Sequence, residues 1–177
     1  MGEVIDAIRT RRSIRKYKQD PIPQEKLDRI LEAALYSPSG IGKQSPIIVC
    51  VQNKELRDRI EKMNSDILVS VGRNGDNPFF GAPVVIVVLA DRKVPTHVED
   101  GSIVCSNIML AAYEEGLGTC WINRAKEEFD SEEGKQILKE LGIEGDYRGV
   151  GHVVIGYADC DLPSPAPRKE GRIHYVK

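Results

Sequence analysis

The sequence has few of the residues that mark secreted, metal-binding or membrane proteins. Its four cysteines form no Cys-x-x-Cys pair and its three histidines are not clustered, which excludes zinc and iron–sulfur sites of the usual spacing. The longest apolar run, residues 82–90, is far shorter than the roughly 20 residues that a membrane-spanning helix needs. We therefore expect a cytoplasmic protein without disulfides, metal or membrane partner.

The chain also lacks the glycine patterns of the common nucleotide-binding loops. Gly40-Ile41-Gly42-Lys43 has Ser37 where a P-loop needs glycine, and Gln44 where it needs Ser or Thr. Gly116-Leu117-Gly118 is followed by Trp121 where a dinucleotide fingerprint needs a third glycine. The histidines form no recognisable arrangement with a Ser or Cys nucleophile. Walker, Rossmann and catalytic-triad chemistry are therefore not indicated.

Helices and strands are expected to alternate within one domain that spans residues 1–177. Apolar residues at helical spacing predict helices around residues 4–8, 27–35, 56–67, 98–115 and 133–141. Short apolar runs predict strands at residues 47–51, 84–89, 117–122 and 151–157, the first of them buried. The segment 37–46 is a loop by composition, and a Pro-rich stretch at 162–167 leads to a basic tail. The predicted architecture is α+β, with sheet edges that a second subunit could cover.

Local signals refine this pattern. Asn53 is placed to cap one helix, and Asp130 with Glu133 forms a capping box for another. Gly116 can end the preceding helix in a left-handed turn. That helix is apolar around much of its circumference, as expected at the centre of a fold or at a subunit interface. His152 lies in a predicted strand, and we interpret it as a hydrogen-bonded core residue.

Basic residues concentrate at both ends of a chain whose formal net charge is −2. Residues 1–18 carry six basic and two acidic groups, residues 168–177 carry four and one, and the remainder carries 15 and 24. The densest run is Arg11-Arg12-Ser13-Ile14-Arg15. Guanidinium groups this close repel one another unless an anion or solvent screens them, and they are natural partners of phosphate. Two basic ends favour one small anionic cofactor over a nucleic acid, which needs a broad basic face.

Several segments resemble, in the same order, those of the nitroreductase family of flavin enzymes. Arg11-Arg12-Ser13-Ile14-Arg15 resembles the family's Arg-x-Ser-x-Arg/Lys motif, and residues 37–44 resemble its Ala-Pro-Ser-x-x-Asn-x-Gln loop. The other similar segments are residues 80–85, residues 116–122, and the ending that runs from Gly156-Tyr157 to Arg168. The resemblance covers nearly the whole chain.

The resemblance implies a nitroreductase-like α+β fold, in which helices flank a central, mainly antiparallel β-sheet and two subunits intertwine as a homodimer. It implies tightly but non-covalently bound FMN at the subunit interface, with NAD(P)H as the reductant. The residues implied to bind FMN are Arg11, Arg12, Ser13, Arg15 and Arg168 around the phosphate and ribityl chain, Pro38, Ser39 and Gly40 from the other subunit, and Gln44, Trp121, Ile122 and Asn123 near the ring. For Trp121 the alternative is a place in the core, which we favour.

The chain departs from the family pattern in two segments. Gly42 stands where the loop often has Asn, which removes one expected polar contact to the flavin. Asn123-Arg124 stands where members often have Glu-Gly or Gly-Gly, at the point where a backbone N–H faces flavin N5. Any residue except proline supplies that N–H, so the contact can persist while the pocket beyond the ring changes.

The chemistry implied is FMN-dependent oxidoreduction. NAD(P)H would pass a hydride to flavin N5, and a nitroaromatic, quinone or related acceptor would then be reduced in a ping-pong cycle, with no catalytic residue from the protein. The alternatives are a relative with another flavin reaction (dehalogenation or flavin cleavage), a non-catalytic FMN-binding protein, and a nucleic-acid-binding module. The lack of interleaved aromatic residues near Arg11 argues against the last.

Overall fold

The computed structural model describes residues 3–177, so Met1 and Gly2 of the predicted domain lie outside the described residues. The helices are α1 (Glu3–Thr10), α2 (Gln24–Leu35), α3 (Lys54–Ser70), α4 (His97–Glu114), α5 (Ala125–Asp130) and α6 (Glu132–Glu140), and a 3-10 turn spans Gly40–Gly42. The strands are β1 (Pro46–Val51), β2 (Val84–Asp91), β3 (Gly118–Ile122) and β4 (Tyr147–Gly156). No helix among residues 3–177 is long and apolar enough to cross a membrane.

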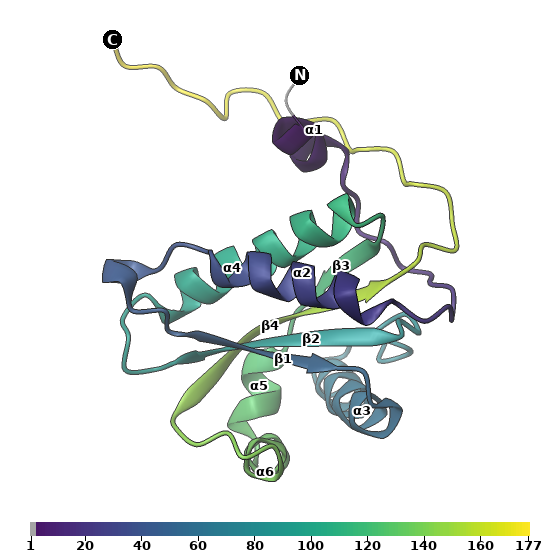
Figure 1. Cartoon of the computed structure of the whole chain (residues 1–177), viewed down its shortest axis with the longest axis vertical. Coiled ribbons are helices and arrows are strands. Elements are labelled where there is room, and N and C mark those ends of the chain that lie inside the picture. Colours follow the sequence, from purple (N-terminus) through teal and green to yellow (C-terminus); the bar gives the residue numbers. More distant parts are fainter. Residues whose placement is uncertain (1–2) are drawn as a thin grey trace.

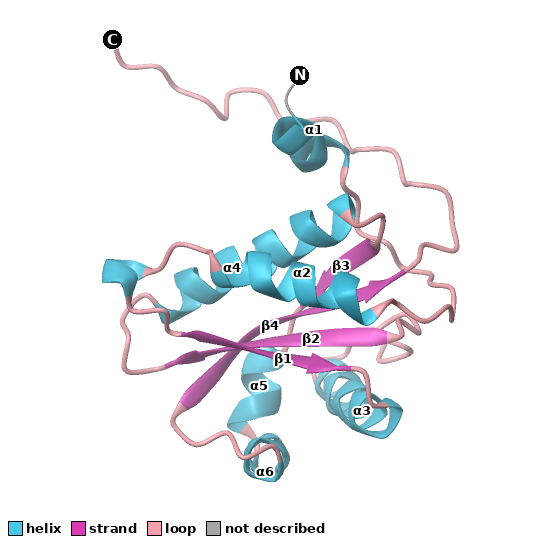
Figure 2. Ribbon diagram, in the orientation of Figure 1, coloured by secondary structure: helices cyan, strands magenta, loops and turns pink. Residues whose placement is uncertain are grey.

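The four strands form one sheet in the order β1-β2-β4-β3, and each neighbouring pair is antiparallel. Helices α2 and α4 lie on one face of the sheet, and α3, α5 and α6 lie on the other (Figure 1, Figure 2). Strand β2 supplies Val85, Val87 and Leu89 to one core and Val84, Ile86 and Val88 to the other. Because both faces of β2 are covered, its sequence is a continuous apolar run. The predicted α+β architecture is confirmed.

Strand β1 corrects one expectation, because only Val51 of the predicted buried strand is fully buried. An apolar run of this length is typical of a buried strand. In the structure β1 is an edge strand with a single hydrogen-bonded neighbour, β2. Its side chains are therefore only half-buried in the described chain, whereas those of β2 are buried from Val84 to Ala90.

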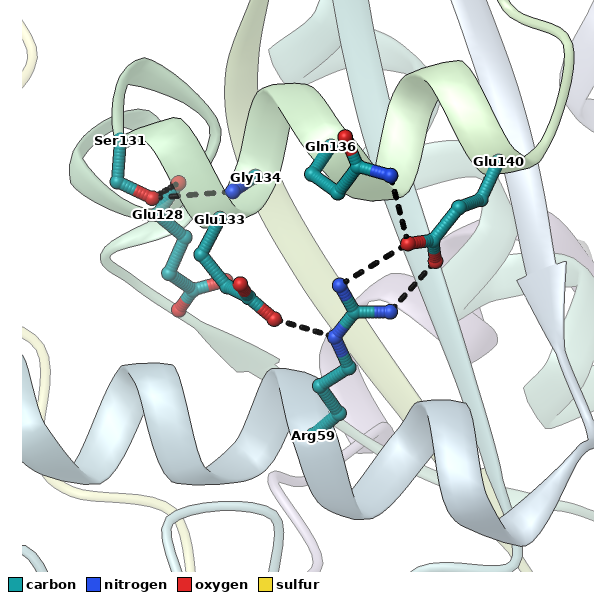
Figure 3. Close-up of polar contacts among 7 residues, drawn as sticks. All are labelled: Arg59, Glu128, Ser131, Glu133, Gly134, Gln136 and Glu140. Carbon is teal, nitrogen blue, oxygen red and sulfur yellow. Dashed lines mark hydrogen bonds and ion pairs between the residues drawn. The ribbon is translucent and has the colours of Figure 1, made fainter.

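The predicted capping box at Asp130 and Glu133 is also wrong. Ser131 is the residue that caps α6, accepting a hydrogen bond from the Gly134 N–H at 3.0 Å. Asp130 instead ends α5, a helix of six residues that is too short to give a periodic apolar pattern. Figure 3 shows what Glu133 does: with Glu140 it contacts Arg59 of α3, which ties α6 to α3.

The chain before α2 and the chain after β4 run together at the β3 edge of the sheet. Ser13 forms a parallel bridge with Thr119, and Tyr17 forms an antiparallel bridge with Ala158. The N–H of Ile14 donates to the Thr119 carbonyl at 2.9 Å. These pairings bring the first arginines and the beginning of the tail into one region, beside α1 (Figure 1).

Candidate functional site

A cavity of about 840 Å³ lies between the segment that follows α1 and the extended tail. Its lining residues are Ile8, Arg9, Arg11, Arg12, Ser13, Arg15 and residues 163–168. Arg168, the first residue of the basic tail, therefore meets the N-terminal arginines in one cavity, as the charge of the two ends suggested. Arg168 lies in this lining, and its exposed guanidinium donates to the Ala166 carbonyl at 2.6 Å.

In this cavity, Arg11 has a buried group without a hydrogen-bond partner in the part of the chain that the structure describes. Its Nη1 atom is buried and has no hydrogen-bond partner among the described residues. A buried donor on a charged group without an acceptor is costly. An anion in the adjoining hollow would supply that acceptor, and the fork geometry of a guanidinium suits a phosphate.

Arg12 is directed to the protein's own backbone. Its Nε donates to the Pro163 carbonyl at 3.1 Å, and its Nη1 donates to the carbonyls of Arg9 at 2.9 Å and Arg11 at 2.7 Å. These bonds hold the Pro-rich stretch against the N-terminal segment. Arg12 therefore shapes the cavity wall that carries Arg11.

A second cavity, of about 340 Å³, adjoins the first because Arg15 lines both. The guanidinium of Arg15 lies 6.0 Å from the centre of the Phe80 ring. Cys120, Trp121, Ile122 and Asn123 supply the wall formed by the end of β3. Three of the predicted ring-contacting residues are thus placed next to the arginine cluster.

Trp121 is not a core residue, so the interpretation that we favoured for it is wrong. It is 43% exposed, because β3 is the other edge of the sheet. Side chains alternate along a strand, so its indole lies on the opposite face from Cys120 and Ile122. There it covers Gly151, where an added Cβ would lie 2.3 Å from the indole nitrogen. Its contact with a cofactor stays a prediction.

Cys120 is the thiol of this second cavity, and it is 3% exposed. Burial raises the pKa of the Cys120 thiol, although Arg15 and Ser13 act in the opposite direction. A neutral thiol is a poor nucleophile. The cavity therefore offers no activated protein nucleophile at this position.

The turn after β3 departs from an ordinary helix start. Arg124 has a φ of 85°, in the left-handed region. Its N–H donates to the Asn123 side-chain oxygen at 2.8 Å, and its guanidinium contacts Glu127 at 2.9 Å. The Arg124 N–H is therefore engaged within the turn. The Asn123 carbonyl accepts a hydrogen bond from the Asn64 side chain at 2.8 Å.

The loop at residues 37–45 is held by Asp100, which is 3% exposed. Its carboxylate accepts hydrogen bonds from the Gly40 N–H at 3.0 Å, the Ser45 hydroxyl at 2.8 Å and the Thr96 hydroxyl at 3.2 Å. Burial alone would raise the pKa of Asp100, but these hydrogen bonds hold it below its ordinary value. Glycine is needed at position 40 because a Cβ there would lie 2.2 Å from the Thr96 hydroxyl oxygen.

The tip of this loop is apolar and strained. Ile41 is 97% exposed and has a φ of 53°, which is costly for a β-branched residue. Gln44 has a φ of 47°, and its N–H donates to the Ser39 hydroxyl at 2.9 Å. Pro38, Ser39 and Gln44 line a small cavity of about 70 Å³, which shares no lining residue with the two cavities described above.

Within one chain, the loop and the arginine cluster lie at opposite ends of α4. The loop contacts Asp100 near the N-terminus of α4, and the Thr10 hydroxyl contacts the Tyr113 hydroxyl near its C-terminus at 2.8 Å. At 1.5 Å per residue these contact points are about 20 Å apart along the helix. The structure therefore brings together the predicted residues 11–15, 121–123 and 168, but not those at 38–44.

Sequence reasoning missed Asp100 and Asn64. Asp100 lies in the first turn of α4, where an acidic residue is common and carries no special signal. Asn64 is 1% exposed and lies one turn after Ile60 on the buried side of α3. A polar residue on an apolar helix face was the signal that could have found it.

Comparison with known proteins agrees with this geometry. The family model described as the nitroreductase family matches residues 8–157 of the chain. The chain belongs to the nitroreductase family. The resemblance that was based on short motifs is thereby confirmed. Within residues 3–177, no group of three or more His, Cys, Asp or Glu side chains could hold a metal ion.

Individual members of the nitroreductase family match most of the chain. A relative from Archaeoglobus fulgidus, provisionally named an NADH dehydrogenase/NAD(P)H nitroreductase, is 32% identical over 175 residues, covering 96% of this chain and 90% of the relative. A relative from Methanothermobacter thermautotrophicus with the same name is 37% identical over 124 residues, covering 67% of this chain but only 60% of the relative. The crystal structure of a nitroreductase with bound FMN from Desulfitobacterium hafniense superposes with a TM-score of 0.89 at 30% identity over 100% of both chains. The predicted nitroreductase fold is confirmed.

Proposed function

We propose that this nitroreductase-family chain binds FMN and passes electrons from NAD(P)H to a nitroaromatic, a quinone or a related acceptor. Its broad class, an FMN-dependent oxidoreductase, follows from the family and from its FMN-binding and FMN-reducing relatives. The observation that carries the proposal is the buried, unpartnered Nη1 of Arg11 in an arginine-lined cavity. That donor fits the phosphate of FMN.

The residues proposed to hold the cofactor fall into three groups. Arg11, Arg12, Ser13, Arg15 and Arg168 would surround the phosphate and ribityl chain, Trp121, Ile122 and Asn123 would border the ring, and Pro38, Ser39, Gly40 and Gln44 would approach from a second subunit. The third group supports a homodimer of single 177-residue domains, because the loop of the same chain is about 20 Å away along α4. The exposed Ile41 at the loop tip would be covered in that dimer.

Bound FMN would supply the redox chemistry, taking a hydride from NAD(P)H and giving electrons to the acceptor. The protein's part is to bind and orient. Arg15 provides positive charge at the junction of the two cavities, which favours added electron density there. Because burial keeps the Cys120 thiol neutral, Cys120 does not act as a competing nucleophile in the cavity.

The test is the absorbance spectrum of the purified protein after addition of FMN. Wild-type protein is expected to retain FMN, to lose the flavin bands when NADH or NADPH is added without oxygen, and to regain them when a nitrofuran or a quinone follows. Arg11→Ala is expected to weaken FMN binding at least about tenfold. Arg92→Ala is the control, since Arg92 pairs with Asp130 and Asp146 elsewhere. A protein that takes up no FMN would contradict the proposal.

Reductive dehalogenation is the alternative. An iodotyrosine deiodinase of Thermotoga neapolitana is 23% identical over 191 residues, covering 99% of this chain. Iodotyrosine is therefore the comparison substrate. Reoxidation of the reduced protein by iodotyrosine, with release of iodide and no reaction with a nitrofuran or a quinone, would favour the alternative. Retained flavin bands after NAD(P)H would favour a non-catalytic FMN-binding protein.

A further inference from the structure

A buried polar network lies directly behind the turn at Asn123. Asn64 on α3 is 1% exposed, and Glu128 on α5 and His152 on β4 are 0% exposed. The Asn64 Nδ2 group donates to the Asn123 carbonyl at 2.8 Å and to Glu128 Oε1 at 2.5 Å. His152 Nε2 lies 2.6 Å from Glu128 Oε2, so the two groups share one hydrogen bond, whose donor is set by the tautomer of the imidazole. One chain of hydrogen bonds thus links four segments.

Stability alone does not account for this network. The His152 ring lies 5.3 Å from the Phe79 ring and 6.4 Å from the Phe129 ring, so its surroundings are apolar. Apolar side chains of similar volume often pack in such a place with equal or greater stability. His152 Nδ1 and Asn64 Oδ1 are moreover buried without a partner among the described residues. The arrangement costs stability that a plain core would keep.

The network reaches the second cavity at one carbonyl group. Asn64 and Asn123 both line that cavity. In a trans peptide the C=O and N–H point in opposite directions. Because the Asn123 carbonyl points towards Asn64, the Arg124 N–H of the same peptide points away from the core. That N–H donates to the Asn123 side-chain oxygen. The carboxamide NH2 of Asn123 is then the polar group that its side chain can offer to a ligand.

The backbone of the turn requires such support. Arg124 has a φ of 85°. A residue other than glycine keeps such a φ only where the surrounding structure fixes it. Glycine, which family members often have here, adopts that conformation without strain. A turn without glycine at this position therefore needs a hydrogen bond that fixes the preceding carbonyl, and Asn64 supplies it.

We propose that Glu128 and His152 are positioning residues that act through Asn64 to fix the Asn123–Arg124 peptide, and with it the donor that Asn123 presents to the cofactor ring. This inference rests on the proposed function, because it concerns how FMN is held. Glu128 and His152 do not themselves line the second cavity.

The test measures the dissociation constant of FMN for the apoprotein, by quenching of flavin fluorescence, together with the visible spectrum of the bound flavin. Asn64→Leu is expected to weaken FMN binding about tenfold and to shift the flavin bands, because the Asn123 carbonyl loses its donor. Ile60→Val is the matched control: it removes a methyl group from a fully buried residue of the same helix and leaves every polar contact in place. Its dissociation constant and spectrum should be those of the wild type.

Two substitutions of Glu128 separate positioning from general disruption. Glu128→Leu removes the carboxyl group shared by Asn64 and His152 and should resemble Asn64→Leu. Glu128→Gln should keep wild-type binding, because its oxygen can accept from Asn64 and its NH2 can donate to His152 Nε2 when the imidazole proton is on Nδ1. The double variant Asn64→Leu/Glu128→Leu should bind FMN no more weakly than Asn64→Leu alone, since both act along one path.

The outcomes are distinct. Wild-type FMN binding and spectrum in folded Asn64→Leu, or losses that add in the double variant, would overturn the positioning role and leave the proposed function standing. A wild-type apoprotein that binds no FMN would overturn the proposed function, and this inference with it. If Glu128→Leu does not fold, Asn64→Leu and Glu128→Gln decide the question, and a Glu128→Gln variant as weak as Asn64→Leu counts against it.

Discussion

At the scale of single residues, strained backbone occurs in three loops that carry or adjoin residues of the candidate site. Positive φ values occur at Ile41 and Gln44 in the loop after α2, at Asn77 and Phe80 in the loop before β2, and at Arg124 after β3. Such conformations persist only where neighbouring structure fixes them, and they often mark functional sites. Of these residues, Phe80 and Arg124 line the second cavity, whereas the loop with Ile41 and Gln44 would reach that cavity only from the second subunit of the proposed homodimer.

Arg124 offers a direct test of this strain. Arg124→Gly should raise the free energy of unfolding by about 0.5 kcal/mol relative to Arg124→Ala, because glycine adopts a positive φ freely while both variants lose the contact with Glu127. Urea denaturation of the two variants measures the difference. Equal stability would mean that the turn is not strained by its side chain.

Asp100 makes the stability of the loop depend on pH. Because its pKa is below the ordinary value in the folded protein, its contribution is complete above the unfolded pKa and is lost as the pH falls through the folded pKa. Asp100→Asn should lower the free energy of unfolding by about 1–2 kcal/mol at neutral pH. The gap between variant and wild type should narrow below about pH 4. Denaturation at several pH values checks this, and a gap that does not change with pH would contradict it.

At the scale of elements, central and edge strands differ in how completely their apolar side chains are buried. Val87 of β2 and Val49 of β1 are direct partners in the sheet and pack towards the same core. Their residue type gives no hint of a difference. Val87 is nonetheless 0% exposed, whereas Val49 is only half-buried at the sheet edge.

This pair gives a matched prediction. Val87→Ala should lower the free energy of unfolding by about 2–3 kcal/mol, and Val49→Ala by about half as much, because less apolar area and a smaller cavity are involved at the edge. Chemical denaturation of both variants provides the comparison. Equal losses would indicate that β1 is covered as fully as β2, as a dimer partner lying over it would cause.

At the scale of the whole molecule, exposed apolar side chains gather on segments that stand away from the core. Val4, Ile5 and Ile8 of α1 are 69%, 51% and 59% exposed, and Ile41 is 97% exposed. The sequence pattern correctly places the three α1 residues on one helix face, and nothing in residues 3–177 of the same chain buries that face. A second copy of the chain is the partner that the proposed homodimer supplies.

The dimer can be tested on this face. Ile5→Asp should shift the protein towards the monomer and weaken FMN binding together, because a charge would have to be buried where the second subunit packs, and Ile5 does not line the arginine cavity. Light scattering coupled to gel filtration gives the mass. Leu141→Asp, at a 43% exposed leucine just after α6, is the control and should change neither. A monomeric wild type would contradict the proposal.

The sequence by itself determined the order and type of most elements, because helical and strand periodicity, the Asn53 cap and the left-handed turn at Gly116 are set by neighbours along the chain. It also determined the family, through short motifs in order. Only the tertiary structure decided which arginine turns to the backbone and which keeps a free donor, that Trp121 is exposed, and that Asp100 holds the loop. These depend on contacts between residues far apart in the chain, and no local spacing records them.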